Sequence, residues 1–183
     1  METCFYVLNY LTSGAGLVYS TPMLSLQDFD AFLFDVMGTI IKHHDDTELI
    51  TTQGIREFLD FLKEEDKKLG IVTSLGRSRL DFYLKYLDLD AYFDVVVTRD
   101  DVKAHKPDPE PYRFALEQLG VQPERAIAFE DSVEGVTSAK DAGIFTVLIR
   151  PDFNDIELEE ASDMVAKDFI RLLQQFRGES MGY

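Results

Sequence analysis

The sequence predicts an α/β protein in which a parallel sheet is covered by helices on both faces. Short apolar segments alternate several times along the chain with longer segments whose apolar residues follow helical spacing. Polar residues come directly after the apolar segments, as expected when strands are buried on both faces. Open sheets of this kind bind ligands at the carboxyl edge of their strands, so that edge is where a functional site is expected.

The amino-terminal half is predicted to hold three strands and two helices. The apolar run at 31–36 suits a buried strand, and the polar segment Lys42–Gln53 is interpreted as a loop. Apolar residues from Ile55 follow helical spacing, with Lys67 and Lys68 closing that helix favourably against its dipole. The other elements expected in this half are a strand at 71–73, a helix with Leu80, Tyr83, Leu84 and Leu87 on one face, and a β-branched strand at 95–97.

The carboxyl-terminal half continues the alternation. Asp108 is expected to cap a helix that has Pro109 in its first position and ends at Gly120. The other elements expected here are a strand at 126–129, a helix at 133–142 followed by Gly143, a strand at 144–149, an acidic loop at 152–160 and an amphipathic helix carrying Phe169, Leu172, Leu173 and Phe176.

Composition limits the classes of partner. The chain has 183 residues, which suits one domain, and its 34 acidic and 18 basic residues give a net charge of -16. A protein with this much negative charge repels polyanions. We therefore expect neither nucleic acid nor an anionic membrane as a general partner. The one cysteine, Cys4, excludes an internal disulfide and fits a reducing compartment, so a cytoplasmic protein is expected. We expect residues 1–25 to be an accessory extension of unknown role and 26–183 to form a single core domain.

Polar side chains follow the predicted strands in a suggestive order. They are Asp35, the hydroxyl of Thr73, Lys106, and the pair Glu130 and Asp131. A helix-capping Asp after an ordinary buried strand would explain Asp35 alone, but the whole set favours a pocket at the carboxyl edge. Mg²⁺ prefers oxygen ligands, and Mg²⁺ with a lysine and a hydroxyl suits a phosphoryl group. Asp35 could then serve as a metal ligand through one oxygen and as a nucleophile through the other.

With this set, the sequence resembles the haloacid dehalogenase-like superfamily, most closely its phosphatase and β-phosphoglucomutase-like branch. The first motif of that family is matched by Asp-Val-Met-Gly-Thr (35–39) except at one position, and the second by Thr73. The third is matched by Lys-Pro-Asp-Pro-Glu-Pro-Tyr (106–112) and the fourth by Phe-Glu-Asp-Ser-Val-Glu-Gly-Val (129–136). The resemblance covers about residues 29–149.

The resemblance implies a Rossmann-like core, Mg²⁺ as cofactor and an aspartyl-phosphate on Asp35. It selects Lys106, rather than Lys103, as the active-site lysine. The expected phosphate-binding residues are Gly38, Thr39, Thr73, Ser74 and Lys106. The expected metal ligands are Asp35, the main-chain carbonyl of Met37, Glu130 and Asp131.

Two departures from the family pattern change the expected activity. Met37 stands where the family has the Asp that acts as general acid and base, and a thioether can do neither. Only residues 41–72 lie between Ile40 and Thr73, so the helical cap domain of the family is expected to be reduced or absent.

Three functions are therefore weighed. The first is a Mg²⁺-dependent phosphatase acting on a small phosphorylated substrate or a phosphorylated macromolecule. The second is a pseudoenzyme that retains the metal and phosphate pocket for binding, which both departures favour. The third is a sugar phosphomutase-like enzyme, which would need the cap and the missing acid. An oligomer in which a neighbouring subunit covers the open site is compatible with the first.

Overall fold

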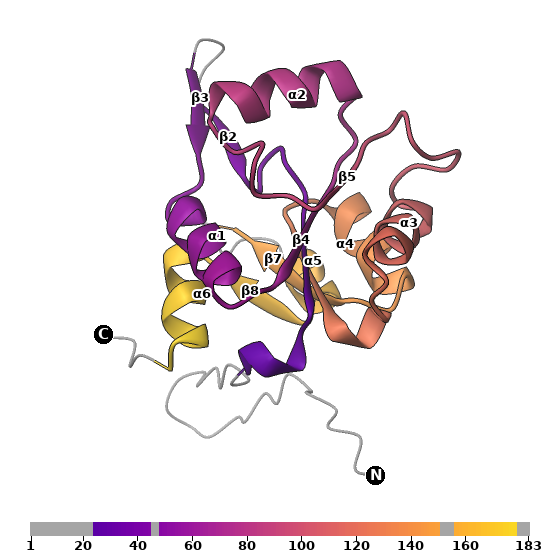
Figure 1. Ribbon diagram of the computed structural model, residues 1–183. Coiled ribbons are helices and arrows are strands. Elements are labelled where there is room, and N and C mark those ends of the chain that lie inside the picture. The colour runs from indigo at the N-terminus through magenta and orange to yellow at the C-terminus, as the bar shows by residue number, and fades with distance from the viewer. Residues whose placement is uncertain (1–23, 45–47, 151–155, 179–183) are drawn as a thin grey trace.

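A computed structural model describes residues 24–44, 48–150 and 156–178, so most of the predicted extension, residues 1–23, lies outside the described residues (Figure 1). The six strands of the main sheet are all parallel, in the order β5-β4-β1-β6-β7-β8. These strands are β1 (Ala31–Phe34), β4 (Lys68–Val72), β5 (Val95–Val97), β6 (Ala126–Glu130), β7 (Phe145–Ile149) and β8 (Met164–Ala166). In the described part of the chain, no helix has the length and apolar character needed to cross a membrane.

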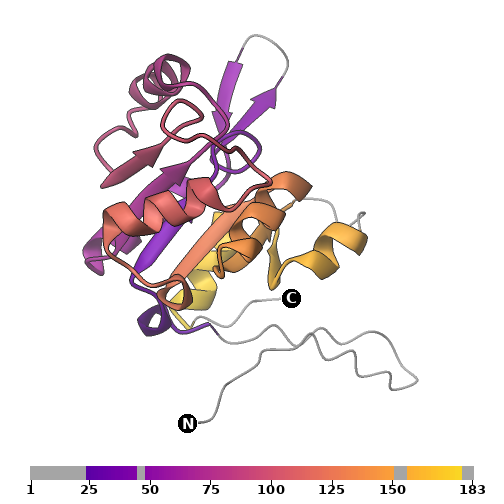
Figure 2. The ribbon, with the colours of Figure 1, turned by 90° about the vertical axis from the view of Figure 1, so that its right-hand side faces the viewer.

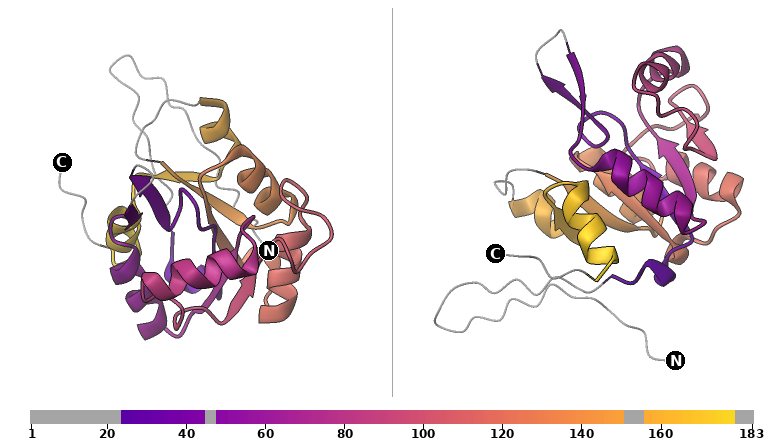
Figure 3. Two further views of the ribbon diagram at one scale, coloured as in Figure 1. Left: turned by 90° about the horizontal axis from the view of Figure 1, so that it is seen from above. Right: turned by 60° about the vertical axis from the view of Figure 1, so that its left-hand side comes forward.

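Helices cover both faces of the sheet, as the alternation of the sequence predicts. Figure 2 shows α3 and α4 in front of one face, and the right panel of Figure 3 shows α1 and α6 in front of the other. The helices are α1 (Ile55–Glu64), α2 (Arg77–Tyr86), α3 (Glu110–Leu119), α4 (Val133–Asp141), α5 (Ile156–Ala161) and α6 (Phe169–Phe176). The predicted α/β fold with a doubly covered parallel sheet is therefore confirmed.

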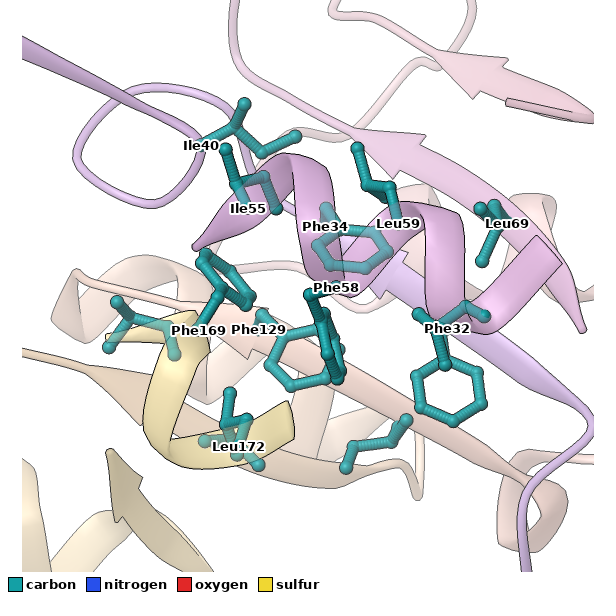
Figure 4. Packing of buried hydrophobic residues seen from close by; sticks show 14 of the residues in the cluster. Phe32, Phe34, Ile40, Ile55, Phe58, Leu59, Leu69, Phe129, Phe169 and Leu172 are labelled. Atoms are coloured by element: carbon teal, nitrogen blue, oxygen red, sulfur yellow. The ribbon is translucent and has the colours of Figure 1, made fainter. Parts of the chain in front are cut away.

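The alternation of side chains along β1 divides the core into two parts. Phe32 and Phe34 face α1 and α6, whereas Ala31 and Leu33 face α3 and α4. The first part is rich in phenylalanine (Figure 4), and the rings of Phe34 and Phe129 stack with their centroids 4.8 Å apart. These rings fix β1 and β6 side by side, and with them the residues at the ends of both strands.

The expected loop at Lys42–Gln53 is wrong, because most of this segment forms an antiparallel hairpin. Its strands are β2 (Ile41–His44) and β3 (Glu48–Thr51). Thr52 anchors its base, donating from its backbone N–H to Ile40 O at 2.8 Å and from its hydroxyl to Thr39 O at 2.5 Å. The hairpin carries too few apolar residues for an alternating pattern, so the sequence gave no strand signal here.

Several boundaries also differ from the prediction. The first helix ends at Glu64, and β4 begins at Lys68 because the backbone N–H of Lys68 donates to Asp30 O at 3.0 Å. Helix α3 begins at Glu110, one residue later than expected, with Pro109 as its N-cap.

The end of the described chain holds two elements that were not predicted. The acidic loop expected at 152–160 instead includes α5, whose Leu158 packs on Leu148 and Val136. The sixth strand, β8, has only three residues and gave no recognisable pattern. Residues 151–155 lie outside the described part of the chain.

The carboxyl edge of the sheet lies between two projecting elements. The hairpin β2–β3 and helix α2 both rise beyond this edge in Figure 1 and in the right panel of Figure 3. Every residue predicted for the site lies at or near this edge, at the end of a strand or in the segment that follows.

Candidate active site

Asp35 is placed by the strand that precedes it. Its backbone N–H donates to Phe129 O at 3.0 Å, which continues the pairing of β1 with β6 one residue past the strand. The chain then turns sharply, since the N–H groups of Ile40 and Ile41 both donate to Val36 O. The turn leaves the Asp35 side chain 10% exposed at the carboxyl edge.

Lys106 reaches Asp35 from the segment before α3. Its Nζ lies 2.8 Å from Asp35 Oδ1, 2.5 Å from Glu130 Oε1 and 2.8 Å from the carbonyl oxygen of Val72. Burial on its own would lower the pKa of Lys106, but the carboxylates of Asp35 and Glu130 outweigh it and raise that pKa above its usual value. The ammonium is therefore charged at any physiological pH.

Glu130 is completely buried at the end of β6. Its Oε1 accepts hydrogen bonds from Lys106 and, at 2.6 Å, from the hydroxyl of Tyr112. Burial raises the pKa of Glu130, and Lys106 acts in the opposite direction. Its other oxygen has no hydrogen-bond partner among the described residues and lies against Gly135, where a Cβ atom would come within 1.8 Å of it. Glu130 is thus the buried counter-charge of Lys106.

Asp131 follows Glu130 and completes an acidic group. One oxygen from each of Asp35, Glu130 and Asp131 lies within 4.8 Å of the others. Burial, and then the negative charge of Asp35, raise the pKa of Asp131 to about 6. Gly38 permits this closeness, because a Cβ atom at that position would lie 1.8 Å from Asp131 Oδ2.

The charges and geometry of this group fit a divalent cation. Three carboxylates and one ammonium carry a formal charge of two negative units. Burial and then the charge of Asp35 raise the pKa of Asp131, and a cation would relieve the repulsion between these two carboxylates. Asp35 and Asp131 are the better candidates as direct ligands, because Glu130 is fully buried, with Oε1 bound by Lys106 and Tyr112 and Oε2 lying against Gly135. Oxygen donors of this kind suit Mg²⁺.

The other residues predicted to bind phosphate differ in burial and in their hydrogen bonds. Thr73 is buried at the end of β4, next to β1, and its hydroxyl accepts a hydrogen bond from the backbone of Leu75 at 3.2 Å. Ser74 is exposed. Thr39 is fully buried, and its hydroxyl oxygen has no partner among the described residues.

Comparison with known proteins adds the decisive observation. A family model described as haloacid dehalogenase-like hydrolase matches residues 19–149. The chain belongs to this family. The predicted family is thereby confirmed.

Two named relatives are longer than this chain. A phosphorylated carbohydrates phosphatase of Thermotoga maritima is 50% identical over 91 residues, covering 50% of this chain and 42% of the relative. The pyrophosphatase PpaX of Bacillus velezensis is 45% identical over 111 residues, covering 60% and 51%. The chain thus spans about half the length of these relatives.

Solved structures agree on the fold. A haloacid dehalogenase-type phosphatase from Thermococcus onnurineus superposes with a TM-score of 0.72 at 25% identity, covering 84% of this chain and 100% of that one. CbbY from Rhodobacter sphaeroides, solved with phosphate, superposes with a TM-score of 0.72 at 21% identity, covering 81% and 99%. The second likeness concerns the fold alone.

This member of the family differs at the position of the acid. Met37 is half-buried and packs against the phenylalanine-rich part of the core. Where a cap domain was expected to be reduced or absent, the described residues between β1 and α1 form the β2–β3 hairpin.

Sequence reasoning missed one residue of the site. Tyr112 is the last residue of the motif at 106–112. No role was predicted for it, because a tyrosine on the inner face of a helix usually belongs to the core. Its position six residues after Lys106 was the available signal. The hydroxyl directed at Glu130 becomes apparent only when α3 is packed on the sheet.

Proposed function

We propose that this chain is a Mg²⁺-dependent phosphatase that cleaves phosphate monoesters through a covalent intermediate on Asp35. The observation that carries the proposal is the buried ammonium of Lys106 at 2.8 Å from Asp35 Oδ1, with Asp131 beside it. Phosphatases among the relatives, such as the phosphorylated carbohydrates phosphatase and the pyrophosphatase PpaX, support it. The phosphate can belong to a small molecule or to a macromolecule.

Asp35 is suited to act as the nucleophile. Lys106 holds Oδ1, and no hydrogen bond in the described part of the chain engages Oδ2. That oxygen would attack phosphorus, forming an Asp35 O–P bond while the ester O–P bond breaks and the ester oxygen leaves as an alkoxide or phenolate with the bonding electrons. Mg²⁺, held by Asp35, Asp131 and the Met37 carbonyl, would neutralise charge on the transferring phosphoryl group.

Thr73 and Ser74 would contribute hydroxyl donors to the phosphoryl oxygens. Thr73 lies at the end of the strand next to Asp35, and Ser74 is exposed to an incoming group. Gly38 would contribute to the phosphate pocket indirectly, by admitting the Asp131 carboxylate beside the turn after Asp35. Water then attacks the phosphoryl group and regenerates the carboxylate of Asp35.

Met37 determines which substrates react best. Without an acid at this position, the leaving oxygen departs unprotonated. General acid catalysis typically increases the rate of such a step by about 10²–10⁴-fold. Leaving groups that are stable as anions, such as a phenolate or a phosphate, are therefore favoured over sugar hydroxyls. A second candidate, binding of metal and phosphate without turnover, is favoured by the same residue because activation of water is also impaired.

The test is hydrolysis of an aryl phosphate by the full chain with Mg²⁺ and with a chelator. We expect metal-dependent turnover that Asp35→Asn abolishes. Turnover that survives Asp35→Asn would overturn the assignment of the nucleophile. Absence of turnover combined with tight Mg²⁺ and phosphate binding by calorimetry would favour the binding protein.

A further inference from the structure

Tyr112 contacts both members of the buried ion pair that supports Asp35. It lies in α3 with no exposed surface, and its hydroxyl donates to Glu130 Oε1 at 2.6 Å. The centroid of its ring is 5.3 Å from the Nζ atom of Lys106, a distance at which an aromatic face attracts an ammonium. One side chain thus touches the carboxylate and the cation together.

All three N–H groups of the Lys106 ammonium are engaged in hydrogen bonds. It carries three N–H donors, and its three acceptors are Asp35 Oδ1, Val72 O and Glu130 Oε1. The Val72 carbonyl is fixed by the sheet, but the two carboxylates are side chains that can rotate. The position of Lys106 against Asp35 therefore depends on what fixes Glu130.

Tyr112 and Lys106 both bind the same oxygen of Glu130. Oε1 accepts from both Tyr112 and Lys106, whereas Oε2 lies against Gly135 without a partner among the described residues. Removing the hydroxyl would take away one of the two hydrogen bonds at Oε1 and leave the carboxylate freer to turn. The ammonium would then be held less firmly on the Asp35 side.

The backbone that carries Lys106 is anchored separately. The carboxylate of Glu110 accepts from the N–H groups of Lys103 and Ala104 at 2.9 and 2.8 Å. The hydroxyl of Ser138 in α4 donates to Asp108 O at 2.6 Å. Because these contacts hold the segment 103–110 by its main chain, substitution of Tyr112 should affect the end of the Lys106 side chain rather than the loop.

We propose that Tyr112 is a positioning residue, which holds Glu130 so that Lys106 stays against Asp35 Oδ1 and leaves Oδ2 free for attack. The proposal rests on the proposed function for its catalytic consequence. Its structural part, the immobilised ammonium, stands without turnover.

Tyr112→Phe tests the proposal, because it removes the hydroxyl and keeps the ring. The matched control is Tyr83→Phe. Tyr83 is also buried, accepts a hydrogen bond from Arg79 at 2.7 Å, and has the Arg79 guanidinium 5.4 Å from its ring centroid. With an aryl phosphate and Mg²⁺, we expect Tyr112→Phe to lower kcat by about tenfold with KM changed less than about twofold. Tyr83→Phe should change neither constant beyond about twofold.

Hydrogen exchange of the Lys106 ammonium provides a readout that does not require activity. In ¹⁵N-detected NMR, the three bonded hydrogens of a buried ammonium should exchange slowly with water, and loss of the signal in Lys106→Arg assigns it. We expect Tyr112→Phe to accelerate this exchange at least about fivefold. Glu130→Gln should do the same, and Tyr83→Phe should not.

Each outcome has a fixed meaning. Faster exchange in Tyr112→Phe supports the proposal even if the unsubstituted chain shows no turnover, and in that case only the proposed function fails. Unchanged exchange overturns the proposal, including when Tyr112→Phe lowers stability or activity, because the residue would then act through packing alone.

Discussion

Charged residues lie at both ends of strands β1 and β6, and the two ends differ in how deeply these residues are buried and in how many charges gather there. At the amino end, Asp30 and Arg125 form two hydrogen bonds, of 2.7 and 3.0 Å, with side chains 50% and 44% exposed. At the carboxyl end, Lys106 joins Asp35 and Glu130 with side chains 5%, 10% and 0% exposed. The same pair of strands thus holds an ordinary surface ion pair and a buried charge cluster.

The difference shows which end is adapted for chemistry. A surface pair needs little desolvation and contributes little, since water and salt screen it. A buried cluster costs desolvation free energy, which hydrophobic residues of similar size would avoid. Retaining three carboxylates and an ammonium at the carboxyl end does not serve stability, and it is what the proposed binding of metal and phosphate requires.

The largest effect is expected from Lys106→Met. This change leaves Asp35 and Glu130 as buried carboxylates without their cation, which should lower the free energy of unfolding by about 3–5 kcal/mol. The measurement is urea unfolding followed by circular dichroism, with chelator present. Lys103→Met in the same segment is the control, since Lys103 is exposed and should change stability by less than about 0.5 kcal/mol. If the two changes lowered the free energy of unfolding equally, loss of the cation from the buried cluster would cost no more stability than loss of a lysine from the surface.

Gly38→Ala and Gly120→Ala compare the two ends directly. Both glycines have positive φ, 89° and 65°, so both changes add backbone strain of about 1 kcal/mol. A Cβ atom at Gly38 would also lie 1.8 Å from Asp131 Oδ2, whereas a Cβ atom at Gly120, near the amino end, meets nothing within 4 Å. We expect Gly38→Ala to weaken Mg²⁺ binding by at least about tenfold in calorimetry, and Gly120→Ala to leave it unchanged.

An unchanged Mg²⁺ affinity in Gly38→Ala would contradict the assignment of Asp131 as a ligand. A similar loss in both would show instead that affinity follows overall stability.

Met37→Asp should increase the activity of the site at the carboxyl end by supplying the missing acid. We expect hydrolysis of an aryl phosphate to increase at least about tenfold, the lower part of the usual range for general acid–base catalysis. Met37→Asn is the control, since it has a similar shape to Asp but no transferable proton, and it should give a clearly smaller gain. No increase in Met37→Asp would mean that the site is limited by something other than the acid.

The smallest effect is expected at the amino end, from Arg125→Gln. The hydrogen bond from Arg125 holds the pKa of Asp30 below its ordinary 3.8. A carboxyl group whose pKa is lower in the folded state stabilises the fold above its unfolded pKa and loses that contribution as the pH falls through the folded value. The stability difference between Arg125→Gln and the unsubstituted chain should thus be small at pH 7, and vanish in acid and in high salt. A difference that persisted in acid would point to packing of the Arg125 side chain.

The sequence predicted most of the fold because its strands are short apolar runs with clear ends. Five of the six strands of the sheet and five of the six α-helices were expected, with shifts of a few residues. The three-residue β8 was missed because its pairing with β7, not its own pattern, makes it a strand. The β2–β3 hairpin was missed because few of its residues are apolar.

The candidate site was predicted to the level of residues but not of contacts. Asp35, Lys106, Glu130 and Asp131 were expected to gather because parallel strands end at one edge, and the structure brings them together. The sequence could not separate the role of Glu130 from that of Asp131. That distinction depends on the Tyr112 hydroxyl and on the two glycines that admit the carboxylates.

The most direct test of the central claim is capture of the covalent intermediate. The chain would be mixed with an aryl phosphate and Mg²⁺, quenched in acid, and analysed by intact mass and peptide mapping. We expect a phosphoryl group on the peptide that contains Asp35, absent with chelator and in Asp35→Asn, and long-lived because Met37 cannot activate water. Metal-dependent turnover with the phosphoryl group on another residue, or with none at any time, would contradict it.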